Sequence, residues 1–426
     1  MQEEQRRLRY GPAGVDYEER INFARMRQER AKKARAKLME HGIAAGLLMT
    51  PANVRYTTGI RLPAHVTFTE FGTLFFSENP DPVVYYIPPT HLQLRFHCPW
   101  IKPENMRAGY RTWSGGAGPK ATEFKAKEFA KSIKRDLVER HLDKEKIGID
   151  QCSAEIRAAL EGEGLKLVSA SKALMDARKI KTEDEINCMK MAGAIVDRAW
   201  WEIYSALRPG ISAQEVAAKA YEVMWRHGAE RVGMVSMRTG PDTAPIYLGT
   251  TPKDRIIQYG DLVYSDIYQV QYAGYNTCYY RTFKVGCRPT QKEKDWYKKT
   301  RDWLYGALSE VKAGATTADS AKHWPGPEVY KAYGVTTEEE IVGCNVAHGM
   351  GLAPYEEPTV SRTVSFDYPQ VYEKGMTIAF ETHFGEPFVG GCRLENIIVV
   401  TDNGWENLYT MPDEEIIVPK HSLIMD

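Results

Sequence analysis

The sequence predicts two domains: an α/β domain over residues 1–179 and a second domain of helices and strands over residues 180–426. The chain has 426 residues, which is more than one hydrophobic core usually serves. Strand-like and helix-like segments alternate before Lys179, whereas two helix-start signals follow it. The boundary is therefore expected near Lys179.

The first domain is expected to alternate helices and strands. Residues 16–38 and 123–139 carry apolar side chains at helical spacing. Short apolar runs that predict strands lie at residues 42–49, 72–77, 82–87, 146–150 and 166–170. Such alternation is typical of an α/β fold, in which helices cover a sheet.

The second domain is expected to begin with two capped helices. Thr182 and Glu185 have the spacing of a capping box, in which each side chain accepts a hydrogen bond from the backbone N–H of the other residue. An apolar stripe at helical spacing follows, and Ser212 with Glu215 repeats the start signal. Two later helices are expected at residues 291–311 and 317–333.

Composition excludes several classes of partner. Hydrophobic residues make up 43% of the chain and charged residues 26%, as in ordinary globular proteins. The 56 basic residues balance 56 acidic ones, so we expect no nucleic-acid partner. No run approaches the length of a membrane span, and the N-terminal segment lacks the apolar core of a secretory signal. The seven cysteines form no C-x-x-C pair, which disfavours a disulfide framework and favours a cytoplasmic location.

Four residues with metal-ligand chemistry lie in short motifs of the second domain. Asp266 lies in YSDIYQV, His348 in VAHGMGL, Glu381 in TIAFETHF and Glu395 in CRLENII. Carboxylates among apolar neighbours are rarely buried without a partner or a metal. One imidazole and three carboxylates suit Fe, Zn or Mn. We therefore expect a divalent transition metal here; the alternative is a relic site with a hydrogen-bond network and no metal.

The motifs resemble those of the pita-bread family, which includes methionine aminopeptidase, proline aminopeptidase, prolidase and creatinase. The matching segments, in family order, are Gly260–Asp266, Gly274–Phe283, His348–Pro358, Gly375–Glu381 and Arg393–Gly404. Residues 53–59 similarly resemble the N-terminal domain of creatinase and proline aminopeptidase. The resemblance implies a creatinase-type α/β N-terminal domain at 1–179 and an α+β pita-bread catalytic domain at 180–426. It also implies a homodimer, which is usual for relatives with this N-terminal domain.

Two kinds of departure from the family pattern bear on function. Cys278 stands where the family has a second bridging aspartate, which favours one metal ion over two. Tyr355, and either Ile246 or Tyr247, stand where the peptidases place histidines that handle protons. Proline peptidase activity is therefore not expected.

Cys278 and its hairpin raise a further question. A buried strand cysteine is usually a small apolar packing group, and we favour that interpretation. Ligation of Zn or Fe is the alternative, so Cys278 is included among the candidate metal ligands. Asp266 lies fifteen residues before Arg281, one more than in peptidases of the family, which predicts a β-bulge in this hairpin.

Three residues are candidates for moving a proton. Glu356 occupies the E-x-P step of the family motif, and Tyr355 precedes it. His383 follows Glu381 by two residues, so on a strand both would face the same side. The structural alternatives are a surface carboxylate for Glu356 and a buried core histidine for His383.

Substrate contacts are expected from aromatic and basic side chains. Tyr268 and Tyr280 belong to a run of six tyrosines between residues 264 and 280. A subset of these could wall a pocket for a ring or a quaternary cation with a carboxylate tail. Arg393 alternates with Glu395 and is expected to orient that carboxylate, or to contact the substrate.

The chain also resembles dimethylsulfoniopropionate lyase at residues 51–57, at 240–243 and in the tail of the His348 loop. This resemblance implies lyase-type cleavage of a C–S or C–N bond in a small carboxylate-bearing molecule. Two alternatives stay open. One is a metal-dependent hydrolase in the manner of creatinase or of a proline dipeptidase, and the other is a catalytically inactive pita-bread module that binds a partner.

Overall fold

The computed structural model describes residues 20–61, 71–87, 93–110, 115–244, 255–341 and 345–423. The chain divides into two compact units, one from Asn22 to Arg178 and one that begins at Lys179. Within the described residues, no helix is both long enough and apolar enough to cross a membrane.

The first unit is a six-stranded mixed sheet covered by helices. Its strands, in spatial order, are β4 (Met106–Ala108), β3 (Val83–Tyr86), β2 (Gly72–Phe76), β1 (Ala45–Leu48), β5 (Lys146–Ile149) and β6 (Lys166–Ser169). Its α-helices are α2 (Phe23–Glu40), α3 (Pro51–Thr58), α4 (Leu94–His97), α5 (Pro119–Val138), α6 (Ala154–Gly162) and α7 (Ser171–Arg178). Phe129 and Ile133 of α5 pack on Ile147 of β5 in one apolar core. The predicted α/β architecture is confirmed.

The second unit contains two antiparallel sheets. The first is β7 (Met234–Thr239), β8 (Leu262–Tyr272) and β9 (Tyr275–Lys284). The second is β11 (Glu356–Val360), β10 (Asn345–Gly349), β12 (Thr377–Glu386), β13 (Gly390–Val400) and β14 (Trp405–Asn407). Its α-helices are α8 (Glu183–Ala206), α9 (Ala213–Arg226), α10 (Gln291–Ser309), α11 (Thr317–Ala321) and α12 (Arg362–Ser365).

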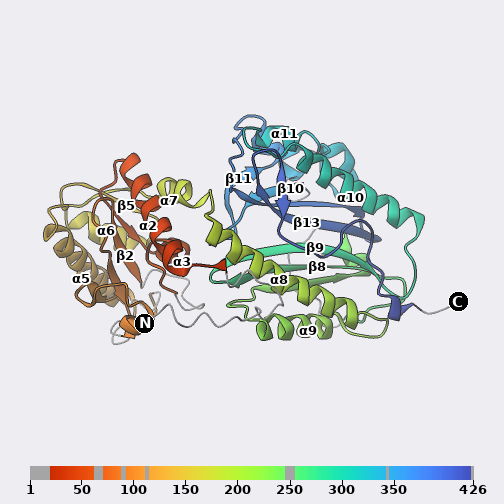
Figure 1. The fold of residues 1–426 in the computed structure, drawn as a ribbon, viewed down its shortest axis with the longest axis horizontal. Coiled ribbons are helices and arrows are strands. Elements are labelled where there is room, and N and C mark those ends of the chain that lie inside the picture. Colours follow the sequence, from red (N-terminus) through yellow and green to blue (C-terminus); the bar gives the residue numbers. More distant parts are fainter. Residues whose placement is uncertain are drawn as a thin grey trace. The chain divides into compact units, whose positions relative to one another are not determined.

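Helices cover the two sheets of the second unit from opposite sides. In Figure 1, α8 lies along β8 and β9, with α9 beside it, whereas α10 and α11 lie on the side of β10 and β13. The two sheets meet where β9 lies against β13. There Thr282 Oγ1 donates to the Arg393 carbonyl oxygen at 2.8 Å, and the Arg281 guanidinium donates to the Glu395 carbonyl oxygen at 2.8 Å. These bonds fix the strands that carry the candidate site.

The helix ends test two sequence predictions. The capping box is confirmed, because Thr182 N donates to Glu185 Oε2 at 2.8 Å and Glu185 N donates to Thr182 Oγ1 at 3.4 Å. The single helix expected at 317–333 is wrong: α11 ends at Ala321, and a 3₁₀ segment runs from Pro327 to Tyr333. Pro325 and Pro327 lack backbone N–H groups, so they cannot continue an α-helix.

Candidate metal centre

Strand alternation sends the motif residues of the second sheet to one face. On β12, Ile378 and Phe380 belong to the apolar core shared with α10, so Glu381 points to the opposite face. Glu381 pairs directly with Glu395 of β13. His348 pairs with Ala379, which lies two residues before Glu381 on β12, so the side chains of His348 and Glu381 point to the same face of the sheet. Three of the four predicted ligands thus share one face of this sheet.

The first sheet supplies the other side of the site. Asp266 of β8 pairs with Tyr280 of β9, and the Tyr280 phenol donates to Asp266 Oδ2 at 2.8 Å. The register then shifts between Ile267 and Val270, where Gln269 has a φ of 54°. The predicted β-bulge is confirmed. In this bulge, Tyr268 and Gln269 of β8 lie opposite a single residue of β9, Cys278.

These residues line one cavity of about 220 Å³. The lining residues are Met234, Asp266, Tyr268, Cys278, Tyr280, His348, Tyr355, Glu381 and Glu395. The structure therefore brings together every predicted metal ligand and three of the predicted tyrosines. Met234 is the addition: it lies opposite Tyr268 in the β7–β8 register, and an isolated methionine carries no sequence signal of such a role.

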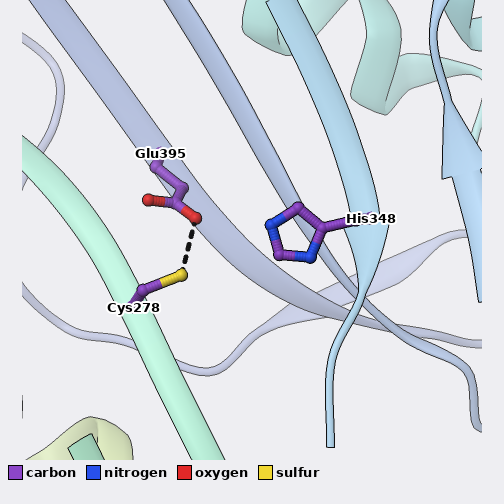
Figure 2. A group of neighbouring side chains, drawn as sticks. All are labelled: Cys278, His348 and Glu395. Atoms are coloured by element: carbon purple, nitrogen blue, oxygen red, sulfur yellow. Dashed lines mark hydrogen bonds between the residues drawn. The ribbon is translucent and has the colours of Figure 1, made fainter. Parts of the chain in front are cut away.

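Cys278, His348 and Glu395 form the tightest cluster in the cavity. One potential ligand atom from each lies within 4.8 Å of the others, and all three residues are buried. The Cys278 thiol donates to Glu395 Oε1 at 2.9 Å, and the imidazole ring of His348 faces this pair (Figure 2). The packing interpretation of Cys278 does not describe these surroundings, because the thiol lies among polar groups.

The tautomer of His348 follows from its contacts. Its Nδ1 lies 3.1 Å from the Gly349 carbonyl oxygen, which can only accept, so Nδ1 carries the proton. Burial lowers the pKa of His348 below its usual value, so the ring is neutral. Nε2 then offers a lone pair to a cation. The ring of Tyr355 packs against the imidazole with centroids 4.5 Å apart.

The carboxylates of the cavity are incompletely paired. Among the described residues, the buried oxygens Asp266 Oδ1 and Glu395 Oε2 have no hydrogen-bond partner. Burial raises the pKa of Asp266 to about 7, opposed by Arg393 and Tyr280 and reinforced by Glu381. Burial, with Glu381 and Asp266, raises the pKa of Glu395 well above its usual value. Unpaired buried oxygens, crowded like charges and a free imidazole nitrogen fit a divalent cation.

Arg393 does not orient Glu395 as expected. Its guanidinium Nη2 donates to Glu381 Oε2 instead, and the guanidinium carbon lies 4.0 Å from the centre of the Tyr280 ring. Arg393 faces the same side of β13 as Glu395, but the cross-strand neighbour Glu381 takes the hydrogen bond. Arg393 is not among the cavity-lining residues. Its position therefore gives no support to a substrate contact and makes it the partner of Glu381.

Glu356 lies outside the cavity. The Glu356 carboxylate is buried and pairs with Lys181 Nζ at 2.8 Å, while Ala353 N donates to its other oxygen at 3.1 Å. A carboxylate held in this way cannot reach a substrate in the cavity. The surface-carboxylate alternative does not describe it either, because this is a buried ion pair.

His383 also lies outside the cavity. Its Nε2 lies 3.2 Å from the Thr243 carbonyl oxygen, and its ring contacts the rings of Tyr264 and Tyr333. Burial, aided by Arg393, lowers the pKa of His383 to about 3, so the ring stays neutral. The core-histidine alternative describes this side chain. Ile246 and Tyr247, one of which stands where the peptidases have a histidine, lie outside the described residues.

Comparisons with known proteins converge on one family. The sequence profile described as metallopeptidase family M24 matches residues 187–402, and the creatinase/prolidase N-terminal domain matches residues 30–180. A Mycobacterium tuberculosis protein named "Probable dipeptidase PepE" is 29% identical over 258 residues, which cover 60% of this chain and 65% of that protein. An Xaa-Pro dipeptidase of Pyrococcus furiosus is 30% identical over 246 residues, which cover 57% and 66%. The match thus spans just under two thirds of the length of these relatives.

Solved structures extend the likeness over most of the chain. An X-Pro aminopeptidase from Thermotoga maritima matches with a TM-score of 0.72 and 20% identity, covering 91% of this chain and 99% of that one. Dipeptidase PepE from Mycobacterium ulcerans matches with a TM-score of 0.71 and 22% identity, covering 93% and 99%. At these identities the likeness concerns the fold. It confirms the predicted creatinase-type N-terminal domain and pita-bread second domain.

Proposed function

Because the chain belongs to metallopeptidase family M24, we propose that it is a metal-dependent hydrolase that cleaves the amide bond of a small, dipeptide-like substrate. The relatives named as dipeptidases support this hydrolase alternative over the lyase-type cleavage that the sequence favoured. The observation that carries the proposal is the single cavity that gathers Asp266, His348 and Glu395.

The residues that would hold the ion are those with free donor atoms. Asp266 Oδ1 and Glu395 Oε2 lack partners among the described residues, and His348 Nε2 has a free lone pair. A bound divalent ion supplies Lewis acidity, which polarises a carbonyl group and lowers the pKa of water. The metal is proposed to be Fe, Zn or Mn on the chemistry of these donors.

We propose that Glu381 is the proton acceptor. It lines the cavity, and its side chain is 12% exposed, so it can meet water there. Arg393 holds its Oε2 and thereby fixes the plane of the carboxylate. In an amide hydrolysis, Glu381 would take the proton of the attacking water and pass it to the leaving amine. This role replaces the one expected for Glu356 and His383.

We propose that Tyr268 and Tyr355 contact the substrate. Both line the cavity, and each phenol affects the pKa of the other. Burial raises the pKa of both phenols, so at neutral pH they are hydrogen-bond donors. Donors at this position can bind a carbonyl or carboxylate oxygen of the substrate. The peptidases that this chain resembles have a histidine at the position of Tyr355. We therefore expect a substrate preference different from that of a proline dipeptidase.

The test is turnover of a panel of dipeptides, with and without an X-Pro bond, and of small β-substituted carboxylates, in water enriched in ¹⁸O. Hydrolysis places one labelled oxygen in the new carboxylate, whereas elimination from a β-substituted carboxylate gives an unsaturated acid without label. Labelled amino acids that disappear after chelation support the proposal. Unlabelled unsaturated product would favour the lyase, and absence of any turnover with metal bound would favour the inactive module. Assembly as a homodimer stays a prediction, which sedimentation analysis tests.

A further inference from the structure

We propose that Cys278 turns this cavity into a one-ion site for a thiophilic cation, bound by Cys278 as thiolate together with Asp266, His348 and Glu395. The inference rests on the proposed function in one respect, that the cavity binds a divalent metal. It adds the ligand set, the number of ions and the class of metal that the cavity prefers.

The first argument is proximity of three different donors. Sulfur, imidazole nitrogen and carboxylate oxygen from Cys278, His348 and Glu395 lie within 4.8 Å of one another, which is the spacing of groups that converge on one ion. The other oxygen of Glu395, Oε2, is buried and has no partner in the part of the chain that the structure describes. A cation that enters here would displace the thiol proton to solvent and take up the free lone pairs.

The second argument is the contrast with another buried cysteine of the same unit. Cys392 lies on β13 in the apolar core, among residues such as Leu394 and Trp296. Its sulfur has only a long contact of 3.9 Å to the Glu293 carbonyl oxygen. Cys392 thus has the surroundings of a cysteine that only fills space in the apolar core. Cys278, beside a carboxylate and an imidazole, has the surroundings of a ligand.

The third argument is the number of donors that remain. Asp266 Oδ2 accepts from Tyr280, and Glu381 Oε2 accepts from Arg393. Two-ion sites need carboxylates that can give one oxygen to each ion. Cys278 offers a single sulfur atom at the position where the resemblance predicts a bridging aspartate. The free oxygens of Asp266 and Glu395, the imidazole of His348 and the sulfur of Cys278 are thus donors for one ion rather than two.

The ligand set also decides the class of metal. Thiolate ligands favour Zn²⁺ and Co²⁺, whereas Mn²⁺ and Mg²⁺ favour sites built of oxygen donors. We therefore expect Zn²⁺ to displace Mn²⁺ from the wild-type cavity. The variant Cys278→Asp carries the aspartate that the family has at this position. In it, the ratio of Zn²⁺ to Mn²⁺ affinity should fall, and a second ion should bind.

The experiment is cobalt substitution of the full chain, followed by absorption spectroscopy and elemental analysis. Wild-type protein and the control Cys392→Ser should bind one Co²⁺ per chain and show a sulfur-to-cobalt charge-transfer band in the near ultraviolet. Cys278→Ser should lose that band. Co²⁺ bound without the band in the wild-type protein, or two ions per chain, would overturn the inference and leave the proposed hydrolase standing. Failure of the wild-type protein to bind any Co²⁺, Zn²⁺ or Mn²⁺ would overturn both.

Discussion

Lys181 Nζ lies 2.8 Å from Glu356 Oε2, and both side chains are almost fully buried, with exposures of 1% and 0%. Lys181 precedes α8 by two residues, whereas Glu356 begins β11, so the pair joins segments that are distant in sequence. The backbone N–H of Ala353 donates to the same carboxylate. The ion pair therefore holds the loop that leads from His348 to β11 and that carries Tyr355 into the cavity.

Removing the cation of this pair should destabilise the protein. Lys181→Met leaves the Glu356 carboxylate buried without its ammonium partner, which typically costs about 3–5 kcal/mol. Urea denaturation should show this loss in the free energy of unfolding. The double variant Lys181→Met/Glu356→Leu should recover most of the loss, because it removes the second charge as well. Equal instability of the two variants would contradict a role of the ion pair itself.

Glu356→Gln should separate structure from chemistry. The amide cannot pair with Lys181 as a charge, so stability should fall, but Glu356 does not line the cavity and the catalytic rate of the folded enzyme should persist. The measurement is kcat/KM per folded molecule at low temperature. Loss of kcat by orders of magnitude, in a variant with wild-type metal content, would restore Glu356 as a proton acceptor.

Glu381→Gln should abolish most of the activity while the protein still binds metal. Loss of a general base typically lowers the rate by about 10²–10⁴-fold. The matched control is Glu386→Gln on the same strand, where Glu386 pairs with Lys292 at the surface. Steady-state kinetics and elemental analysis of both variants decide the matter. If Glu381→Gln lost its metal together with its activity, Glu381 would be a ligand first.

Metal-free protein should become less stable as the pH rises through neutrality. The pKa of Asp266 in the folded, metal-free state is about 7, above the value near 3.9 of an unfolded aspartate, so folding takes up a proton. The resulting stabilisation is complete below about pH 4 and is lost as the pH rises through about 7. In the presence of chelator at pH 8, Asp266→Asn should therefore be more stable than the wild-type protein by a few kcal/mol, since one pKa unit corresponds to about 1.4 kcal/mol.

The same pair of proteins provides the control for that prediction. The difference in unfolding free energy between Asp266→Asn and wild type should shrink toward pH 5, and it should reverse when Zn²⁺ is added, because the ion needs the charged carboxylate. His383 has a lowered pKa and contributes with the opposite sign, but it is common to both proteins and cancels in the comparison. A pH-independent difference would contradict the burial of an ionisable Asp266.

Tyr355→Phe should weaken substrate binding without loss of metal. The ring still packs on His348, whereas the phenol that faces the substrate is removed. Loss of one hydrogen bond is expected to lower kcat/KM by about tenfold, equivalent to about 1.4 kcal/mol. Tyr368→Phe, at a tyrosine that is 77% exposed, is the control. Unchanged kinetics in Tyr355→Phe would leave this phenol without a substrate contact.

Local sequence patterns were sufficient to predict the elements of the site. The apolar neighbours of Glu381 and Glu395 mark these carboxylates as candidates, and the spacing of Asp266 and Arg281, compared with that of the family, predicts the bulge. The Thr182 capping box is likewise a local signal. The capping box depends only on residues within one turn, whereas the bulge needs comparison with the family spacing; neither requires knowledge of the fold.

Long-range partners could not be read in the same way. The motif gives Glu356 the position of an active-site acid, but its carboxylate forms an ion pair with Lys181, which lies 175 residues earlier in the sequence. Arg393 pairs with Glu381 rather than with its near neighbour Glu395, because the register of β12 against β13 decides the contact. Met234 reaches the cavity only through the pairing of β7 with β8. Each depends on strand pairing or burial, which local patterns do not specify.

The central claim is that a divalent ion in this cavity lets the protein hydrolyse a small amide. The most direct measurement is the rate of amino-group release from the dipeptide panel by chelator-treated protein titrated with Zn²⁺. The account predicts no turnover without metal and a rate that rises with added ion until each chain holds one. Turnover that persists after complete removal of metal, or none at saturating bound metal, would contradict it.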